Sequence, residues 1–319
     1  MPVKSVATEM PKISCLSEYV LKILAVIGLI MAMAGCAPER TIMESTAKVV
    51  GEPVVVGKLA NQQISEASGL ASSGLYAGAL WVINDGGNDP LLYTIGIDGS
   101  DLGSFRVEGA NNDDWEALAS FRLQDTAYLL IADVGDNWEQ REICTLYVVE
   151  EPVITAAGLG DEPAARIAWQ IDFTYEDGPR DCEAVAVDTA GLRVLLLTKR
   201  VLSPVLYELP LKPADPGATA LASRLTTLHH FSWPTAMDIA PDGLSAVVLT
   251  YDNVYLFTRS QKEDWAAAFN KKPRPLNFNP LSQQEAICFG FYGKSLYVTS
   301  EQISAPLVRI DLETASTKP

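Results

Sequence analysis

Acidic side chains recur in this 319-residue sequence at a spacing that would bring them together in a repeated fold. A Glu-Ala-like step enters a short apolar segment at four places, and a fifth, degenerate copy has methionine instead. The copies begin at Glu66, Glu116, Glu183, Met237 and Glu285. Two further acids, Asp114 and Asp181, precede their glutamates by two residues. Clustered carboxylates repel one another unless they are protonated, paired with a cationic side chain or bound to a metal ion.

A second set of polar residues ends the strongly apolar segments that follow these steps. Its members are Asn84, Asp85, Asp133, Lys199, Tyr251 and Glu301. If the two segments are antiparallel neighbours, the end of the second lies beside the start of the first. Both sets then share one face, with Asp114 and Asp181 in loops above it.

These oxygen donors predict a calcium site. Calcium accepts six to eight oxygen ligands in a flexible geometry, and residues 84–89 and 133–137 are loops that can supply them. The predicted ligands are Glu66, Asp85, Asp114, Glu116, Asp133, Asp136, Asp181, Glu183, Glu285 and Glu301. Lys199 and Arg141 could instead neutralise part of the charge, and the same residue types also satisfy backbone groups in turns.

The elements that must position these residues form a repeat of about 50 residues, with four short strands in each copy. This pattern predicts an all-β protein, a five-bladed β-propeller over residues 51–319, with six blades as the alternative. The last copy ends before its fourth strand. The isolated strand at residues 53–58 is therefore predicted to complete the last blade and close the ring, which leaves no free sheet edge. A β-sandwich would not require five repeats in phase.

The first 35 residues are predicted to direct export, and the next 15 to tether the protein to its lipid anchor. Residues 1–35 combine lysines with an apolar run of a dozen residues, and Cys36 follows Gly35 as in a bacterial lipobox. We expect a lipoprotein signal peptide, acylation of Cys36 and a tether over residues 36–50; a plain secretory signal is the alternative. The expected location is the bacterial cell envelope, at the outer membrane facing the periplasm, with membrane contact only through the lipid.

Composition and the absence of several motifs argue against some classes of function. The formal charge of −16 argues against nucleic acid as a partner, because phosphates would be repelled. No GxSxG, HExxH or P-loop motif occurs, and the two histidines, His229 and His230, lie outside the repeated positions. Cys144, Cys182 and Cys288 allow one disulfide at most, and buried free thiols are the simpler expectation.

Several of these phrases together resemble a family of secreted bacterial propellers. They are residues 84–88, 114–116, 133–137 with Arg141, 151–152, 175–178, 181–184, 238–243 and 284–287. Over about residues 60–310 the sequence is similar to the SdiA-regulated propellers and the esterase-like phytase domain. The resemblance implies a five-bladed fold and calcium binding, and it implies no settled activity.

Two functions follow as hypotheses. The first is an envelope-anchored, calcium-binding propeller that binds a ligand or an envelope partner at its carboxylate-lined mouth. The second is a metal-dependent hydrolase of esters or phosphoesters, with the cation held by Glu116, Glu183 and Asp133. In that case Lys199 would stabilise negative charge and Tyr251 would donate a proton. A purely structural calcium ion is a third possibility.

We predict that Cys36 carries the lipid. Cells grown with a clickable fatty acid should label the wild-type protein, whereas Cys36→Ala should remain unlabelled and leave the membrane fraction, because the acylated thiol is gone. Gel fluorescence of the purified proteins measures the label. Equal labelling of both proteins would contradict the prediction.

Overall fold

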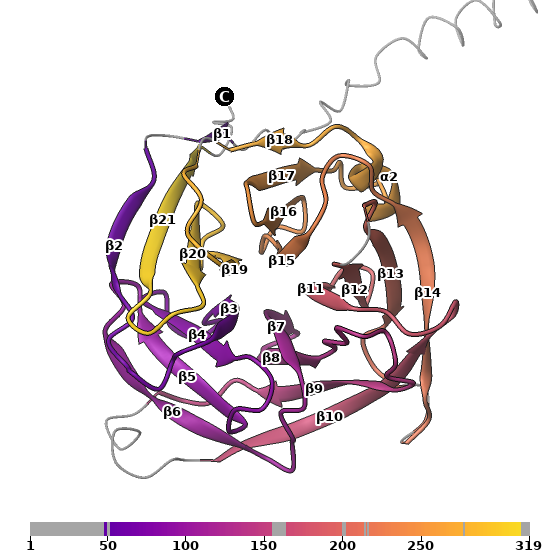
Figure 1. Cartoon of the computed structure of the whole chain (residues 1–319), viewed down its shortest axis with the longest axis horizontal. Coiled ribbons are helices and arrows are strands. Elements are labelled where there is room, and N and C mark those ends of the chain that lie inside the picture. The colour runs from indigo at the N-terminus through magenta and orange to yellow at the C-terminus, as the bar shows by residue number, and fades with distance from the viewer. Residues whose placement is uncertain are drawn as a thin grey trace, which may run out of the picture. The chain divides into compact units, whose positions relative to one another are not determined.

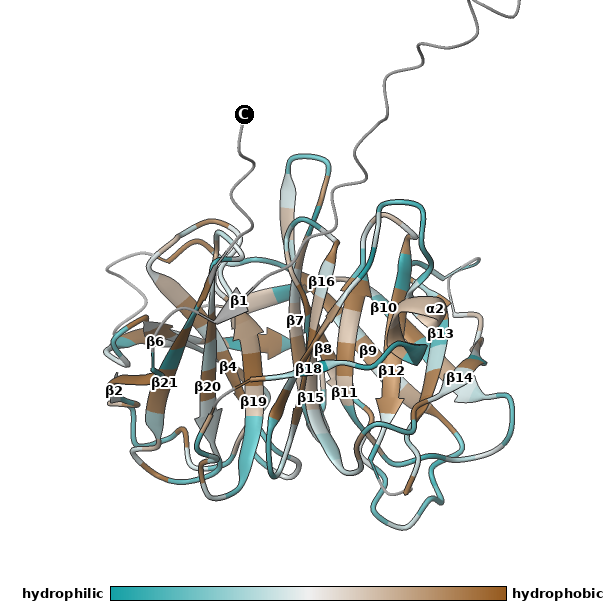
Figure 2. Ribbon diagram, turned by 90° about the horizontal axis from the view of Figure 1, so that it is seen from above, coloured by the Kyte–Doolittle hydropathy of each residue, from teal (hydrophilic) through white to brown (hydrophobic). Residues whose placement is uncertain are grey.

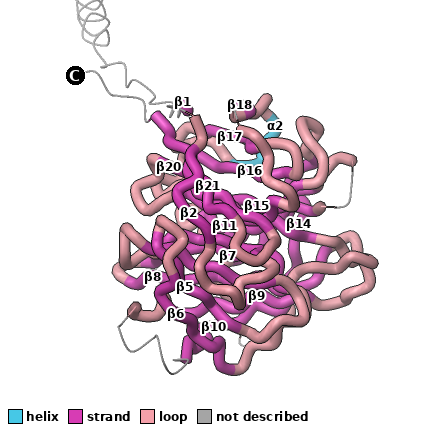
Figure 3. Tube along the Cα trace, turned by 60° about the vertical axis from the view of Figure 1, so that its left-hand side comes forward, coloured by secondary structure: helices cyan, strands magenta, loops and turns pink. Residues whose placement is uncertain are grey.

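The computed structural model describes residues 48–49, 52–154, 164–199, 202–213, 215, 217–276 and 278–313. The predicted signal peptide, Cys36 and nearly all of the tether lie outside the described residues. The described residues belong to one compact unit, Glu44–Pro319. They are nearly all strand and loop, with one short helix (Figure 3). Within them, no helix is both long and apolar enough to cross a membrane.

The strands follow one another as antiparallel groups. The first group is β3 (Ala67–Ser72), β4 (Ala79–Asn84), β5 (Leu91–Gly96) and β6 (Asp101–Glu108); the second is β7 (Trp115–Leu123), β8 (Thr126–Asp133), β9 (Cys144–Glu150) and β10 (Ala164–Tyr175). The third is β11 (Cys182–Asp188), β12 (Arg193–Thr198), β13 (Val205–Pro210) and β14 (Ala220–Thr227); the fourth is β15 (Pro234–Ile239), β16 (Ser245–Thr250), β17 (Val254–Thr258) and β18 (Arg274–Pro275). The last is β19 (Gln284–Phe289), β20 (Ser295–Ser300) and β21 (Pro306–Glu313), with β2 (Val54–Lys58) and β1 (Lys48–Val49) on its outer edge. The helix, α2 (Trp265–Asn270), packs beside β14 and β17.

The first strand of each group lies at the centre. β3, β7, β11, β15 and β19 each contact the next, and β19 contacts β3, so the contacts close a ring (Figure 1). The strands run between two faces formed by loops (Figure 2). This arrangement is that of a β-propeller. Because the hydrogen-bonded pairs are antiparallel, the starts of the first strands and the ends of the second strands lie on the same face.

The apolar core lies between neighbouring groups. Clusters of buried aliphatic and aromatic side chains join the first group to the second, the second to the third, and so on to the fourth and the last. A further cluster, which includes Leu59, Leu80, Ala286 and Leu307, joins the last group to the first. The central strands are therefore covered on both faces, which explains why their residues are apolar without strict alternation.

The strand at residues 53–58 closes the ring, as the sequence predicts. β2 pairs antiparallel with β21, from Val54 opposite Arg309 to Lys58 opposite Pro306. β1 extends this edge along the same strand, opposite Leu312 and Glu313. The last group thereby gains an outer strand from the other end of the described chain.

The long strand β10 departs from a simple pattern of separate sheets. Its first residues pair in parallel with residues 106–108 of β6, and its last residues pair in parallel with residues 220–222 of β14. The first three groups consequently join into one 12-stranded sheet. At 12 residues, β10 is long enough to reach from the outer edge of one neighbour to that of the other.

Ring closure predicts a specific sensitivity at Gly57. An alanine Cβ there would lie 1.8 Å from the backbone oxygen of Asp98, so Gly57→Ala should displace β2 and lower the free energy of unfolding by about 1–3 kcal/mol. Val55→Ala, which changes a 59% exposed side chain of the same strand, should stay within about 0.5 kcal/mol of wild type. Urea unfolding measures both. A Gly57→Ala protein as stable as wild type would show that β2 is not docked.

Candidate metal centre

Each central strand is irregular at its second residue. The pairing with the second strand skips one residue there, as in a β-bulge, in all five groups. The skipped residues are Ser68, Glu116, Glu183, Thr235 and Glu285. A bulge re-aims the side chain of the extra residue, and bulges are common beside active sites.

The structure corrects the sequence alignment in two repeats. Glu66 and Met237 were expected at the same position as Glu116, but Ser68 and Thr235 hold it. The Ser68 hydroxyl donates a hydrogen bond to the Trp115 carbonyl oxygen at 2.8 Å, and the Thr235 hydroxyl donates to that of Gln284 at 3.0 Å. Both hydroxyls therefore link their strand to the strand of the next group, while the other three positions carry glutamates.

Two more levels surround these bulged residues. The residue after each second strand forms one level: Asp85, Val134, Lys199, Tyr251 and Glu301. The residue two positions before each bulge forms the other: Glu66, Asp114, Asp181, Trp233 and Gln283. Backbone N–H groups of the first level donate to carbonyls of the second, for example Asp85 to Glu66 at 2.8 Å and Lys199 to Asp181 at 2.9 Å. Val134, not Asp133, is thus the equivalent of Lys199.

The three bulged glutamates converge. Glu116, Glu183 and Glu285 are 2–6% exposed, and one carboxylate oxygen from each lies within 4.8 Å of the others. They come from three different groups, so the fold itself imposes the proximity. Together with Asp85, Asp114 and Glu301 they form what we call the acidic mouth.

Lys199 and Tyr251 stabilise one side of the acidic mouth, the lysine by its charge and the tyrosine by a hydrogen bond. The Lys199 ammonium contacts Glu183 Oε1 directly and lies 3.7 Å from Glu285 Oε1. The Tyr251 hydroxyl donates to the same Glu285 oxygen at 2.5 Å, and its ring lies 5.3 Å below the ammonium. Burial lowers the pKa of Lys199, but the charges of Glu183 and Glu285 outweigh that effect and raise it overall. Lys199 is therefore a fixed cation.

The other side of the acidic mouth consists of carboxylates alone. One oxygen each from Asp85, Asp114 and Glu116 lies within 4.8 Å of the others. The Asp114 carboxylate fits between two glycine backbones: a Cβ on Gly86 would lie 2.5 Å from Asp114 Oδ1, and one on Gly135 would lie 2.5 Å from Oδ2. The glycines in these two loops thus leave room for the carboxylate.

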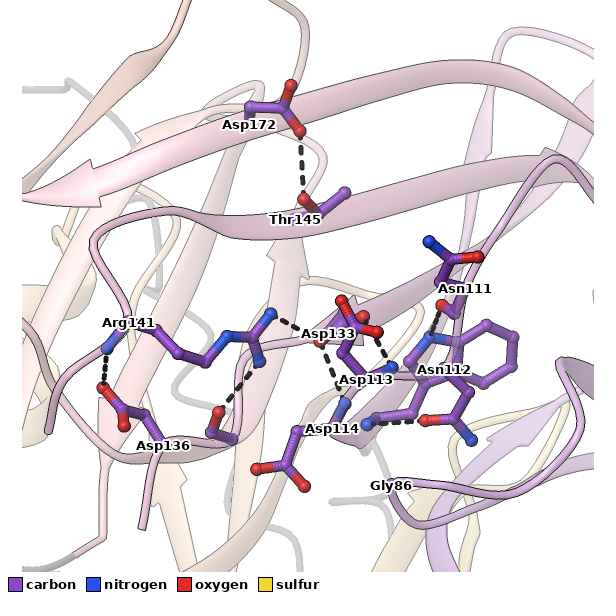
Figure 4. Close-up of polar contacts among 12 residues, drawn as sticks. Gly86, Asn111, Asn112, Asp113, Asp114, Asp133, Asp136, Arg141, Thr145 and Asp172 are labelled. Carbon is purple, nitrogen blue, oxygen red and sulfur yellow. Dashed lines mark hydrogen bonds and ion pairs between the residues drawn. The ribbon is translucent and has the colours of Figure 1, made fainter. Parts of the chain in front are cut away.

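Three predicted ligands are instead engaged in organising the loops. Asp133 accepts hydrogen bonds from the backbone N–H groups of residues 113 and 114 and forms an ion pair with Arg141 at 2.7 Å. Asp136 accepts from the Arg141 backbone N–H, and Asp181 accepts from the Asp136 backbone N–H at 3.1 Å. In Figure 4, Arg141 lies between Asp133 and Asp136. Of the remaining predicted ligands, Glu66 is exposed and accepts a hydrogen bond from Asn88 at 2.8 Å.

Burial without enough counter-charge raises the pKa values of the acidic mouth. Burial, followed by the charge of Asp85, raises the pKa of Asp114 to about 6. Burial and the neighbouring Glu285 raise the pKa of Glu301 to about 8. Burial also holds the pKa values of Glu116 and Glu183 well above their ordinary range. These carboxylates would bind either protons or a metal ion in preference to remaining bare.

One atom of the acidic mouth has no partner in the described part of the chain. Glu183 gives Oε1 to Lys199, while its Oε2 is buried and accepts no hydrogen bond from any described residue. A buried carboxylate oxygen without a hydrogen-bond or ion-pair partner lowers the stability of the folded protein. It is therefore an indication, independent of the acidic cluster itself, that a cationic ligand belongs here.

The cysteines take no part in the acidic mouth. Cys144, Cys182 and Cys288 are buried free thiols, as expected. Burial raises the pKa of Cys144 to about 11, so this thiol stays protonated and inert.

No protein-family model and no curated protein matches the chain. Among solved structures, the PQQ-bound aldose sugar dehydrogenase of Streptomyces coelicolor is 10% identical over 84% of this chain and 98% of its own, with a TM-score of 0.48. A chain of the nidogen/laminin complex is 12% identical, covers 73% and 72%, and has a TM-score of 0.42. U3-55K is 12% identical, covers 77% and 67%, and has a TM-score of 0.35. Similarity at this level assigns no function.

The ion pairs of Lys199 predict a strong dependence of stability on that residue. In buffer with a chelator, Lys199→Met should lower the free energy of unfolding by roughly 3 kcal/mol, because buried glutamates lose their cation. Adding Glu183→Gln should recover a large part of the loss, and urea unfolding measures the coupling in a double-mutant cycle.

Lys271→Met is the matched control for that cycle. Its exposed ion pair with Glu263, at 2.6 Å, should contribute about 1 kcal/mol or less. Equal losses for Lys199→Met and Lys271→Met, or no recovery with Glu183→Gln, would contradict the assigned role of Lys199.

Proposed function

We propose that the acidic mouth binds calcium and that the protein uses this loaded mouth to bind a ligand or a protein partner in the cell envelope. The observation that carries the proposal is the combination of three buried, converging glutamates with the unpartnered Oε2 of Glu183. Lys199 offsets the charge on the side of Glu183 and Glu285. The side with Asp85, Asp114 and Glu116 is the part that a metal ion would complete.

The donor set fits calcium better than magnesium. All the groups are oxygens, and calcium binds oxygen at 2.3–2.6 Å, so opposite ligands stand up to about 5 Å apart. Magnesium requires about 2.0–2.1 Å and near-ideal octahedral geometry, and it usually retains several waters, whereas calcium accepts a larger and less regular set of carboxylates. The predicted ligands Asp85, Asp114 and Glu116 would hold the ion, with Glu183 beside them.

Exposed apolar side chains support a binding role for this face. Trp138 and Ile143 project from the loop between β8 and β9, Leu202 from that between β12 and β13, Trp233 from that before β15, and Ile303 from that before β21. Trp138 is 82% exposed and Leu202 is 85% exposed. All these loops lie on the face that carries the acidic mouth. A polar site surrounded by accessible aromatic and aliphatic groups is typical of an interaction surface.

The contacts of Lys199 and Tyr251 favour binding over hydrolysis. Both groups were candidates for catalysis, but Lys199 is held by two glutamates and the Tyr251 hydroxyl already donates a hydrogen bond to Glu285. Burial, together with the hydrogen bond to Glu285, raises the pKa of Tyr251 and makes it a weak proton donor. The expected third member of the hydrolytic set, Asp133, is occupied by Arg141.

The finer features of the fold and location belong to the same proposal. We propose five blades, each the four-strand group described above, with β2 as the outer strand of the last. We also propose that the chain is exported, acylated at Cys36 and displayed on the periplasmic side of the outer membrane. The relation to the SdiA-regulated propellers and the esterase-like phytase domain remains a proposal from the sequence motifs.

Calcium should stabilise the folded protein. Millimolar calcium should raise the thermal midpoint of chelator-treated protein by several degrees, because a ligand at a hundredfold excess over its Kd adds about 2.7 kcal/mol. Glu116→Gln should lose most of the shift, whereas Glu150→Gln, an exposed acid at the opposite end of the strands, should keep it. Magnesium should give a smaller shift.

Calorimetric titration with calcium supplies the second measurement for the same variants. A wild-type protein free of residual metal that melts at one temperature with and without calcium would overturn the proposal. So would equal shifts in wild type and Glu116→Gln, since the ion would then bind elsewhere.

A further inference from the structure

A pocket lies at the other end of the ring. The acidic mouth is formed at the starts of the five central strands, and this pocket is lined at their ends, by Ser72, Ser120, Asp188, Ile239 and Phe289. About four residues separate the two ends of each strand, which corresponds to roughly 13 Å. The pocket has a volume of about 310 Å³, within the size range of small-molecule sites.

The pocket wall is largely apolar. Phe121, Phe289 and Phe291 line it together with Val187 and Pro241. An organic molecule with a flat or aliphatic body would therefore lose unfavourable contact with water on entering.

Asp238 is the distinctive polar group of this wall. Its Oδ1 accepts a hydrogen bond from its neighbour's backbone N–H, at Ile239, and its Oδ2 accepts one from the Phe289 backbone N–H, both at 2.8 Å. These bonds fix the carboxylate between β15 and β19 at the pocket. Within the described residues Asp238 has no ion-pair partner, and each of its oxygens retains a further lone pair.

The other charged groups at the pocket are already engaged. Asp188 forms ion pairs with Arg193 at 3.0 Å and with Arg259 at 3.1 Å. Arg122 donates from one guanidinium nitrogen to the Gly74 carbonyl oxygen and from the other to that of Asp125. Asp238 is thus the group whose charge a ligand could compensate.

We propose that this pocket binds a small organic amine, with its ammonium group on Asp238 and its apolar body against the phenylalanines. The site is independent of the calcium proposal, because it uses none of the residues of the acidic mouth. A carboxylate ligand would be repelled by Asp238, and a neutral ligand would leave its charge uncompensated.

The ionisation of Asp238 gives the proposal a pH signature. Burial raises the pKa of Asp238 to about 7, while its two backbone hydrogen bonds oppose the shift. Among the other titratable and charged groups, Cys288 on β19 interacts electrostatically with Asp238, and the ion-paired Asp188 on β11 and Arg122 on β7 line the same pocket. Below about pH 6 Asp238 is neutral and should bind an ammonium group weakly, whereas above about pH 8 it is charged and should bind it well.

The test uses 2-phenylethylamine and its neutral counterpart 2-phenylethanol as probes, with calorimetric titration of the full chain. The amine should bind at pH 8.5 at least about tenfold more tightly than at pH 5.5, and more tightly than the alcohol at pH 8.5. The alcohol should show no such dependence on pH. Absence of amine binding at both pH values, or equal affinity for amine and alcohol, would overturn the proposal.

Variants locate the site. Asp238→Asn should weaken amine binding about tenfold and abolish its pH dependence, whereas Asp311→Asn, a change of the same charge on β21, should leave it unaltered. Glu116→Gln should also leave it unaltered, which separates this site from the calcium site. Amine binding of wild-type affinity and unchanged pH dependence in Asp238→Asn would place the site elsewhere. If Asp238→Asn fails to unfold cooperatively, the pH series on the wild-type protein decides the question.

Discussion

The acidic mouth depends on one backbone irregularity repeated around the ring. Every central strand has a β-bulge near its start. The bulge re-aims the side chain of the extra residue away from the regular pattern of its own sheet. Where it carries a hydroxyl, as at Ser68 and Thr235, it donates to the strand of the next group. Where it is a glutamate, it joins two others at the centre. The same local geometry thus serves to join neighbouring groups and to gather carboxylates.

Buried carboxylates that lie close together repel one another. Two cationic side chains around the acidic mouth compensate part of this repulsion. Lys199 sits against Glu183 and Glu285 as a permanent internal cation. Arg141 does the same for Asp133, in a loop that also uses backbone N–H groups as partners. Between these two compensated regions lie Asp85, Asp114 and Glu116, whose pKa values are all raised. An exchangeable cation is the compensation that this remaining part lacks among the described side chains.

The sequence predicted the repeated groups of strands because each repeat contains apolar segments of similar length and spacing. It also predicted β2 as the closing strand, because an unpaired apolar strand and an incomplete last repeat complement each other. It misplaced the equivalent residues in the first and fourth groups by two positions. Glu66-Ala67 repeats the dipeptide of Glu116-Ala117, yet the pairing of Ala67 with Asn84 places Ser68 at the bulge.

A different alignment would have revealed the levels of the acidic mouth. The ends of the second strands, at Asn84, Asp133, Thr198, Thr250 and Ser300, are equivalent to one another, and counting from them gives the correct register. The sequence alone does not show which group each acidic side chain will contact. Asp114 immediately precedes β7 and Asp133 ends β8, yet only the fold directs Asp133 to Arg141 and Asp114 between two glycines.

The pairing of β2 with β21 also determines when the ring can close. Val54 is among the first residues of the described chain to leave the ribosome, and its partner Arg309 is among the last. Until synthesis is almost finished, the first group has no neighbour on one side, and the cluster of Leu59, Leu80, Ala286 and Leu307 does not exist. Until residues 306–309 are available, the ring cannot close, and the folded part of the chain leaves a sheet edge and an apolar surface uncovered, which are the features that make incomplete chains prone to aggregate.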